Sequence, residues 1–207
     1  MMAEFDKNYW EDHWHPTGAQ RAHHFPANPY LPVETAHLPA GTALDAGCGA
    51  GTEALWLAEH GWEVTAADIS AAALTAARAR AVDRDLNTRL EWIETDLARW
   101  EPERTWDLVL TSYAHADIGQ LAFYRRISSW VAPGGTLLIV GHLPGQHHGG
   151  HGHEHPEDAT ATLDGITALF RDPDWRVEAG YEHTRTFDAG GAGVPLHDVI
   201  VRARRLS

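Results

Sequence analysis

Three glycines and two acids share one short segment of the chain. Gly47, Gly49 and Gly51 alternate with small residues just after Asp45, and Asp68 follows Gly47 by 21 residues. Glycines let a backbone turn tightly and let a ligand approach it closely. A carboxylate at the end of the next strand suits a pair of ribose hydroxyls. The spacing therefore predicts a nucleoside site.

Two kinds of cofactor fit a glycine loop that joins a strand to a helix. A dinucleotide site reads G-x-G-x-x-G and holds pyrophosphate at the helix N-terminus. This chain reads G-x-G-x-G, and Asp45 precedes it where an acid would repel pyrophosphate but suit the methionine ammonium of S-adenosylmethionine. Asp96, after the third expected strand, suits an adenine amino group. We therefore expect S-adenosylmethionine, with a nucleotide-cofactor oxidoreductase as the alternative.

The elements that position these residues alternate between strand and helix. Short apolar runs predict strands at 42–46, 63–67, 90–94, 106–110 and 136–140, with later strands near 175–181 and 195–203. Helical patterns cover 52–60, 70–82 (with Ser70 as the N-cap), 119–131 and about 164–170. Alternation of this kind predicts an α/β fold with a doubly wound, mostly parallel sheet. The two late strands predict a terminal antiparallel hairpin.

Domain organisation follows from the same pattern. Residues 1–40 contain no clear strand, and we expect a lid or short helices there, with 41–207 forming one domain. Trp10, His13, Trp14 and His15 could close over a site, although a plain amphipathic helix explains them too. A histidine-rich loop occupies 142–158.

Composition limits the class of partner. The chain has 207 residues, a formal net charge of −13 and 43% hydrophobic residues. An acidic surface repels phosphate backbones, so a small-molecule substrate is expected and a nucleic acid is not. Neither a signal peptide nor a membrane-length apolar run is apparent, which predicts a cytoplasmic protein without a membrane partner. We expect a monomer or a homodimer. A single cysteine, Cys48, leaves no internal disulfide.

Several segments carry a family resemblance. LDAGCGAGT, VTAADIS, ETDL, WDLVLTSYAH and VAPGGTLLIVGH resemble class I S-adenosylmethionine-dependent methyltransferases. NPYL, ALWLAEHGWEVTAADIS and GGTLLIVGH resemble, more narrowly, the small tellurite-resistance and thiopurine-type methyltransferases of actinobacteria. The resemblance implies a Rossmann-like, seven-stranded sheet whose last strand is antiparallel and inserted beside the sixth. It also implies a small acceptor bearing sulfur, oxygen, nitrogen or a metalloid.

The resemblance also implies roles for individual residues. The glycine loop lines the methionine side, Asp68 and Ile69 hold ribose and adenine, and the segment after the fourth strand lies near the methyl group. The expected cofactor-binding residues are Asp45, Gly47, Cys48, Gly49, Gly51, Thr52, Asp68, Ile69, Ser70, Asp96, Leu97, Ser112 and Tyr113. One position departs from the family pattern, because Phe25 stands where a tryptophan is expected before Asn28.

Histidines at the carboxyl ends of strands are the candidate catalytic residues. His115 follows the fourth strand and His142 the fifth, at the edge where ligands bind such sheets. Methyl transfer needs a general base only if the nucleophile arrives protonated. Packing histidines are the alternative interpretation. Tyr113 could shape the pocket or belong to the core, and Cys48 could be reactive or simply small enough to lie beside a cofactor.

The histidine-rich loop suggests a metal. His147, His148, His151, His153 and His155 lie in it, and imidazole suits zinc, nickel and copper. A metal there could activate the substrate, or the loop could cap the site without one. A solvated loop is the simpler explanation. A metal-binding protein on a methyltransferase fold therefore remains a further alternative.

Overall fold

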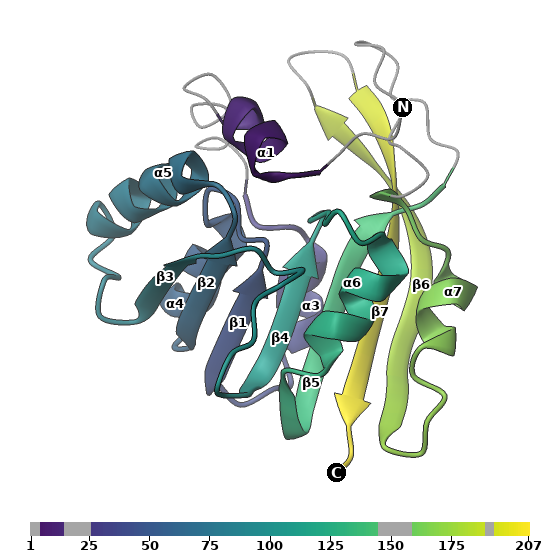
Figure 1. The fold of residues 1–207 in the computed structure, drawn as a ribbon. Coiled ribbons are helices and arrows are strands. Elements are labelled where there is room, and N and C mark those ends of the chain that lie inside the picture. The colour runs from purple at the N-terminus through teal and green to yellow at the C-terminus, as the bar shows by residue number, and fades with distance from the viewer. Residues whose placement is uncertain (1–4, 15–25, 145–158, 189–192) are drawn as a thin grey trace.

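A seven-stranded sheet organises the chain (Figure 1). The structure, a computed structural model, describes residues 5–14, 26–144, 159–188 and 193–207. Its strand order is β3-β2-β1-β4-β5-β7-β6, with β7 antiparallel to both of its neighbours. The strands are β1 (Thr42–Ala46), β2 (Glu63–Asp68), β3 (Leu90–Glu94), β4 (Trp106–Ser112), β5 (Val131–His142), β6 (Trp175–Asp188) and β7 (Gly193–Arg205). The predicted Rossmann-like sheet, with its last strand inserted beside the sixth, is confirmed.

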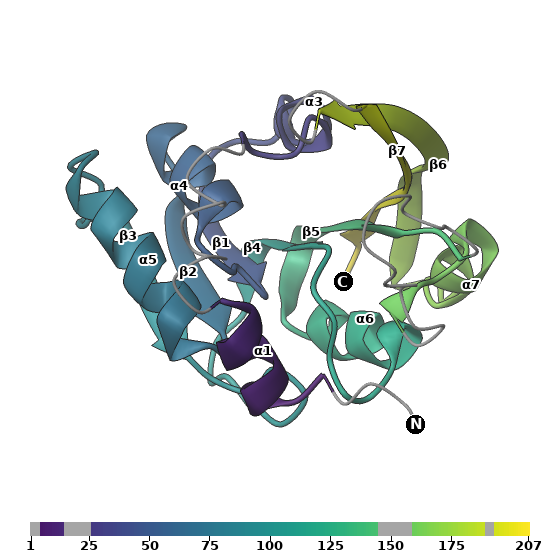
Figure 2. The same ribbon diagram turned by 90° about the horizontal axis from the view of Figure 1, so that it is seen from above.

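Helices cover both faces of this sheet. They are α1 (Lys7–His13), α3 (Tyr30–Thr35), α4 (Thr52–Glu59), α5 (Ala71–Val82), α6 (Gln120–Ser128) and α7 (Leu163–Ala168). Seen from above, α3 and α4 lie on one side of the strands, and α6 and α7 lie on the other (Figure 2). Central strands such as β1 are buried on both faces, which explains their continuous apolar runs.

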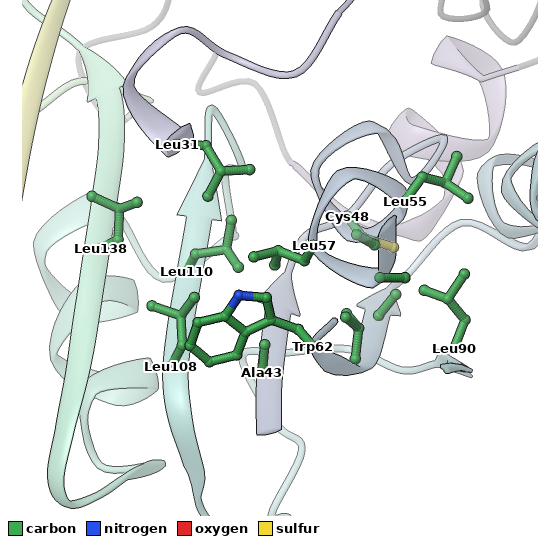
Figure 3. Packing of buried hydrophobic residues seen from close by; sticks show 14 of the residues in the cluster. Leu31, Ala43, Cys48, Leu55, Leu57, Trp62, Leu90, Leu108, Leu110 and Leu138 are labelled. Atoms are coloured by element: carbon green, nitrogen blue, oxygen red, sulfur yellow. The ribbon is translucent and has the colours of Figure 1, made fainter. Parts of the chain in front are cut away.

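Two apolar clusters hold the layers together. On one face, Leu31 of α3 and Leu57 of α4 lie against Leu110 of β4, in a cluster that also includes Leu138 of β5 (Figure 3). On the other, Phe123 of α6 packs in a cluster with residues of β4, β5 and β7. The expected Ser70 cap is present, since its Oγ accepts the backbone N–H of Ala73 at 3.1 Å.

Some element boundaries differ from those expected. The helix expected over 119–131 ends at Ser128, and β5 already begins at Val131 because Val131 pairs with Trp106 of β4. Gly134, with φ +78°, lies in the early part of β5, near a shift in the register with β4. β6 runs to Asp188, well past the expected end near 181, because β7 continues to pair with it beyond the edge of the sheet.

The topology brings the candidate residues to one edge. β1 pairs with β2 on one side and β4 on the other, so their carboxyl ends meet where the connections diverge to opposite faces. α1 lies across this edge in both views (Figures 1 and 2). Within the described residues, no helix is both long enough and apolar enough to cross a bilayer.

Candidate active site

A cavity of about 1250 Å³ opens at the carboxyl edge of the sheet. Its wall combines α1, the glycine loop, the ends of β2, β4 and β5, and Arg185 of β6. Pockets for one small ligand usually occupy roughly 300–1,000 Å³. The cavity is therefore large enough for two molecules lying side by side.

The glycine loop forms a cradle that side chains could not share. Gly47 and Gly49 adopt left-handed conformations, with φ +82° and +50°. A Cβ on Gly47 would lie 2.2 Å from the Cβ of Ala114, and one on Gly49 would lie 2.7 Å from the ring of Trp14. Side chains at both positions would clash, so the loop keeps its backbone exposed to the cavity.

Asp68 is bonded directly to this loop. Its Oδ2 accepts the N–H of Gly49 at 2.8 Å, and its Oδ1 accepts the N–H of Ser70 at 2.9 Å. Burial raises the pKa of Asp68, although these backbone hydrogen bonds oppose the shift. The carboxylate is thereby held rigidly at the cavity wall, where two hydroxyls could reach its remaining lone pairs.

Two further acids lie close to Asp68. Asp45 is 1% exposed, and its Oδ2 has no hydrogen-bond partner within the described part of the chain. Burial, then the charges of Glu53 and Asp68, raise the pKa of Asp45 well above its usual range. Burial also raises the pKa of Glu53, against hydrogen bonds from Asn28. Clustered acids of this kind are costly unless a proton or a cation neutralises them, so the site accommodates a positively charged ligand better than an anionic one.

The expected cofactor residues fall into two groups. Most line the cavity: Gly47, Cys48, Gly49, Thr52, Asp68, Ile69, Asp96, Leu97, Ser112 and Tyr113. Asp45, Gly51 and Ser70 lie outside its lining. Gly51 is the N-cap of α4 and packs on Trp92, whereas Ser70 caps α5. Their expected contacts with a cofactor remain predictions.

Asn28 and Glu53 are site residues that sequence reasoning did not single out. The Nδ2 of Asn28 donates to Ser112 Oγ at 2.9 Å, and its backbone N–H donates to Glu53 Oε1 at 3.1 Å. Both residues line the cavity. The helix dipole favours an acid in the first turn of any helix, so the position of Glu53 in the sequence does not by itself indicate a ligand-binding role.

Cys48 belongs to the apolar packing beneath the loop. It lies near Leu55 in the close view and is 5% exposed (Figure 3). Burial, followed by the charges of Asp68 and Asp45, raises the pKa of its thiol well above the usual range. A thiol held in its protonated form is a poor nucleophile, which favours the interpretation of a small packing residue.

Tyr113 and Arg185 form a polar wall at the other end of the cavity. Tyr113 has φ +55°, an uncommon conformation for a bulky residue. Its hydroxyl accepts from Arg185 Nη2 at 3.1 Å, and Arg185 Nε donates to the fully buried Asp198 at 2.7 Å. Burial, followed by the negative charge of Asp198, raises the pKa of Tyr113. The hydroxyl is thus kept protonated and fixed in position.

His115 and His142 lie beside this wall. The ring of His142 is 4.6 Å from that of Tyr113 and 6.0 Å from that of His115. Gln120 donates its Nε2 to Ala114 O at 2.8 Å, so its Oε1 is the atom that meets His115 Nδ1 at 3.1 Å. His115 Nδ1 therefore donates to Gln120 Oε1, which fixes the orientation of the ring.

Other predictions fall partly outside the described residues. His147, His148, His151, His153 and His155 lie there, as do Phe25 and His15. Within the described residues, no group of three or more potential ligands could hold a metal. The metal prediction is therefore untested. Trp10, His13 and Trp14 line the cavity, as a lid would require.

Comparison with known proteins finds methyltransferases. Residues 43–135 match a methyltransferase domain family. An uncharacterized methyltransferase of Mycobacterium tuberculosis is 37% identical over 110 residues, covering 51% of this chain and 53% of the relative. Ribosomal RNA small subunit methyltransferase C of Alcanivorax borkumensis is 35% identical over 106 residues, covering 48% and 32%. The chain thus spans about half or less of these relatives.

Two further matches extend over more of the chain. A probable thiol methyltransferase 2 of Arabidopsis thaliana is 27% identical over 145 residues, covering 68% of this chain and 64% of the relative. The magnesium protoporphyrin IX methyltransferase of Synechocystis PCC 6803, solved with bound S-adenosylmethionine, has a TM-score of 0.66 and 18% identity. That alignment covers 99% of this chain and 100% of the other, so the described part of this chain shares that protein's fold.

Proposed function

We propose that this chain is a class I S-adenosylmethionine-dependent methyltransferase that methylates a small molecule, because residues 43–135 match a methyltransferase domain family and the fold resembles that of a methyltransferase solved with S-adenosylmethionine. The observation that carries the proposal is the acidic cluster of Asp45, Glu53 and Asp68 around an open glycine cradle. It fits a ligand with a sulfonium, an ammonium and a ribose better than one with a diphosphate. Asp45 Oδ2 has no hydrogen-bond partner within the described part of the chain, but Asp45 lies outside the cavity lining, so it would favour a cationic ligand through its charge and not by direct contact.

Each part of this ligand has a matching set of residues. Asp68 would take the ribose hydroxyls, and Asp96 and Leu97 would hold the adenine edge. Glu53, with the loop from Gly47 to Gly49, would hold the methionine end. When bound, S-adenosylmethionine would supply a methyl group on its sulfonium, which would pass in line to the nucleophilic atom of the acceptor and leave a neutral thioether.

The chain's own groups would orient the acceptor and move its proton. His115 would take the proton of a hydroxyl, thiol or ammonium acceptor, because it lines the cavity and a hydrogen bond between its Nδ1 and Gln120 Oε1 fixes its ring. His142 lies close enough to share this task. Phe5 and Trp10 flank His115 at 5.3 and 6.2 Å between ring centroids and exclude water from that side.

The net charge of the chain and its similarity to known methyltransferases narrow the class of acceptor. A formal net charge of −13 disfavours a nucleic acid. The thiopurine-type resemblance and the likeness to a probable thiol methyltransferase favour a thiol or other chalcogen. Nitrogen, oxygen and metalloid acceptors share the same in-line chemistry and stay within the proposal.

Methyl transfer to ring-matched probes tests this function. Tritiated S-adenosylmethionine would be incubated with thiophenol, phenol or aniline, which differ in the nucleophilic atom alone. We expect transfer to thiophenol to exceed the other two, and we expect His115→Gln to reduce transfer to phenol, which arrives protonated, more than transfer to thiophenol, which is largely ionised at neutral pH. Absence of transfer to all three, with no binding of S-adenosylhomocysteine, would overturn the proposal.

A further inference from the structure

α1 is held to the rest of the molecule by few contacts. It has seven residues and none is buried. A helix this short is not stable on its own in water. Its position across the cavity must therefore depend on the specific polar and ring contacts that it makes.

Glu11 makes the most extensive of these contacts. Its Oε1 accepts the N–H of Ala71 at 2.8 Å, and its Oε2 accepts from Ser70 Oγ at 3.1 Å and from the N–H of Ala72 at 3.2 Å. These donors form the N-terminus of α5, a helix of 12 residues. A carboxylate is favoured there because it bonds to otherwise unpaired N–H groups and complements the helix dipole.

A second ion pair supports the same placement. Lys7 Nζ lies 2.5 Å from Glu94 Oε1, at the end of β3. Both side chains are about half exposed, so this pair adds little on its own. Glu11 is the better candidate for the contact that fixes α1, since it combines a charge with three donors on one helix end.

The docking point is next to the expected ribose site. Ser70 is two residues beyond Asp68, and its N–H donates to Asp68 Oδ1 at 2.9 Å. Asp68 and Ser70 therefore share one short turn, in which Asp68 faces the cavity and Ser70 meets Glu11. A ligand that bonds to Asp68 therefore lies directly beside the surface on which α1 docks.

The opposite side of α1 contacts His115, in the part of the cavity proposed to bind the methyl acceptor. Trp10 stacks on His115 with an interplanar angle of 26°, and Phe5, just before the helix, is 5% exposed beside the same ring. The single helix thus contacts the segment after β2 and the segment after β4. Its loss would leave the acceptor half of the cavity without one wall.

We propose that Glu11 is a positioning residue that docks α1 on α5 and thereby completes the acceptor pocket once the cofactor is bound. This inference rests on the proposed function. It makes cofactor and acceptor binding cooperative, because the same docked helix is needed for both halves. Glu11 touches neither substrate and acts through Phe5 and Trp10.

Hydrogen exchange of the full chain tests the docking without an activity assay. Backbone amides of residues 7–13 would be followed with and without S-adenosylhomocysteine in the wild type, Glu11→Ala, Glu11→Gln and the control Glu63→Gln. Glu63 is exposed at the start of β2 and outside the cavity lining. We expect the ligand to slow exchange of α1 in the wild type and control, but much less in Glu11→Ala, with Glu11→Gln intermediate.

Kinetics with thiophenol provide the second readout. We expect Glu11→Ala to raise KM for thiophenol by roughly tenfold, as for the loss of a charge-assisted hydrogen bond, with a smaller change in kcat. Equal slowing of exchange in the wild type and Glu11→Ala, or an unchanged KM, would overturn the inference. Failure of the wild type to bind S-adenosylhomocysteine would instead overturn the proposed function.

Discussion

The backbone N–H of Gly49 donates to Asp68 Oδ2 over 2.8 Å, which ties the glycine loop after β1 to the acid that ends β2. The two motifs that most strongly suggest a nucleoside site are therefore one rigid unit. A change in either should alter the other. The loop geometry and the carboxylate position can then be tested separately by choosing substitutions that affect only one of them.

Gly49→Ala should damage the cavity more than the fold. Its φ of +50° and the ring of Trp14 at 2.7 Å from the new Cβ both oppose a side chain. Gly134→Ala is the matched control, with φ +78° and open space around the new Cβ. Both should lose about 1–2 kcal/mol of unfolding free energy from backbone strain. We expect Gly49→Ala alone to weaken S-adenosylhomocysteine affinity, measured by calorimetry, and equal affinities in the two variants would contradict this.

Tyr113 and Arg185 should act as a pair in catalysis. Tyr113→Phe removes the hydroxyl that accepts from Arg185, and Arg185→Lys removes the planar fork that bonds both Tyr113 and Asp198. Each should lower kcat/KM for thiophenol about tenfold while S-adenosylhomocysteine affinity stays within twofold. A double variant should lose less than the sum of the two, by about 0.5–1.4 kcal/mol of coupling. Strict additivity would show that the residues act independently.

Asp45 should make the ligand-free protein less stable as pH rises. Burial, then Glu53 and Asp68, raise its folded-state pKa above the ordinary value of 3.8. The folded state therefore binds more protons than the unfolded state, and its stability falls as pH rises from about 4 through the raised pKa. Asp45→Asn should reduce this loss. Melting temperatures between pH 4 and 8 would show a flatter profile for Asp45→Asn, whereas an identical slope would count against the assignment.

The histidine-rich loop allows a direct test of metal dependence. If His147 and His148 hold an activating ion, chelator treatment should remove activity and one of zinc, nickel or copper should restore it. His147→Ala combined with His148→Ala should reproduce the chelator effect. Activity that survives both treatments would leave the loop without a role for metal.

Sequence patterns predicted the local parts of this site and missed its long-range contacts. The glycine loop and Asp68 could be recognised because a strand, a turn and a helix follow one another along the chain. Arg185 and Asp198 could not, since their link to Tyr113 joins residues 72 or more positions apart. The extent of β6 was also missed, because its pairing with β7 beyond the sheet edge depends on the partner strand more than on its own apolar pattern.

Residues at the N-terminal end illustrate the same limit. The aromatic and acidic composition around Trp10 was compatible with either a lid or an ordinary amphipathic helix. Which of the two interpretations holds depends on the hydrogen-bond partners of Glu11. These are the first residues of α5, some 60 positions away along the chain. A single sequence does not indicate such a pairing.

The most direct test of the account is calorimetric titration of the purified chain with S-adenosylhomocysteine. The wild type and the control Asp83→Ala, whose residue is exposed at the end of α5, should bind one ligand per chain with equal affinity. Asp68→Ala should bind about a hundredfold more weakly, since it loses the carboxylate that would accept from both ribose hydroxyls. No binding to the wild type, or unchanged affinity in Asp68→Ala, would contradict the assignment of this site.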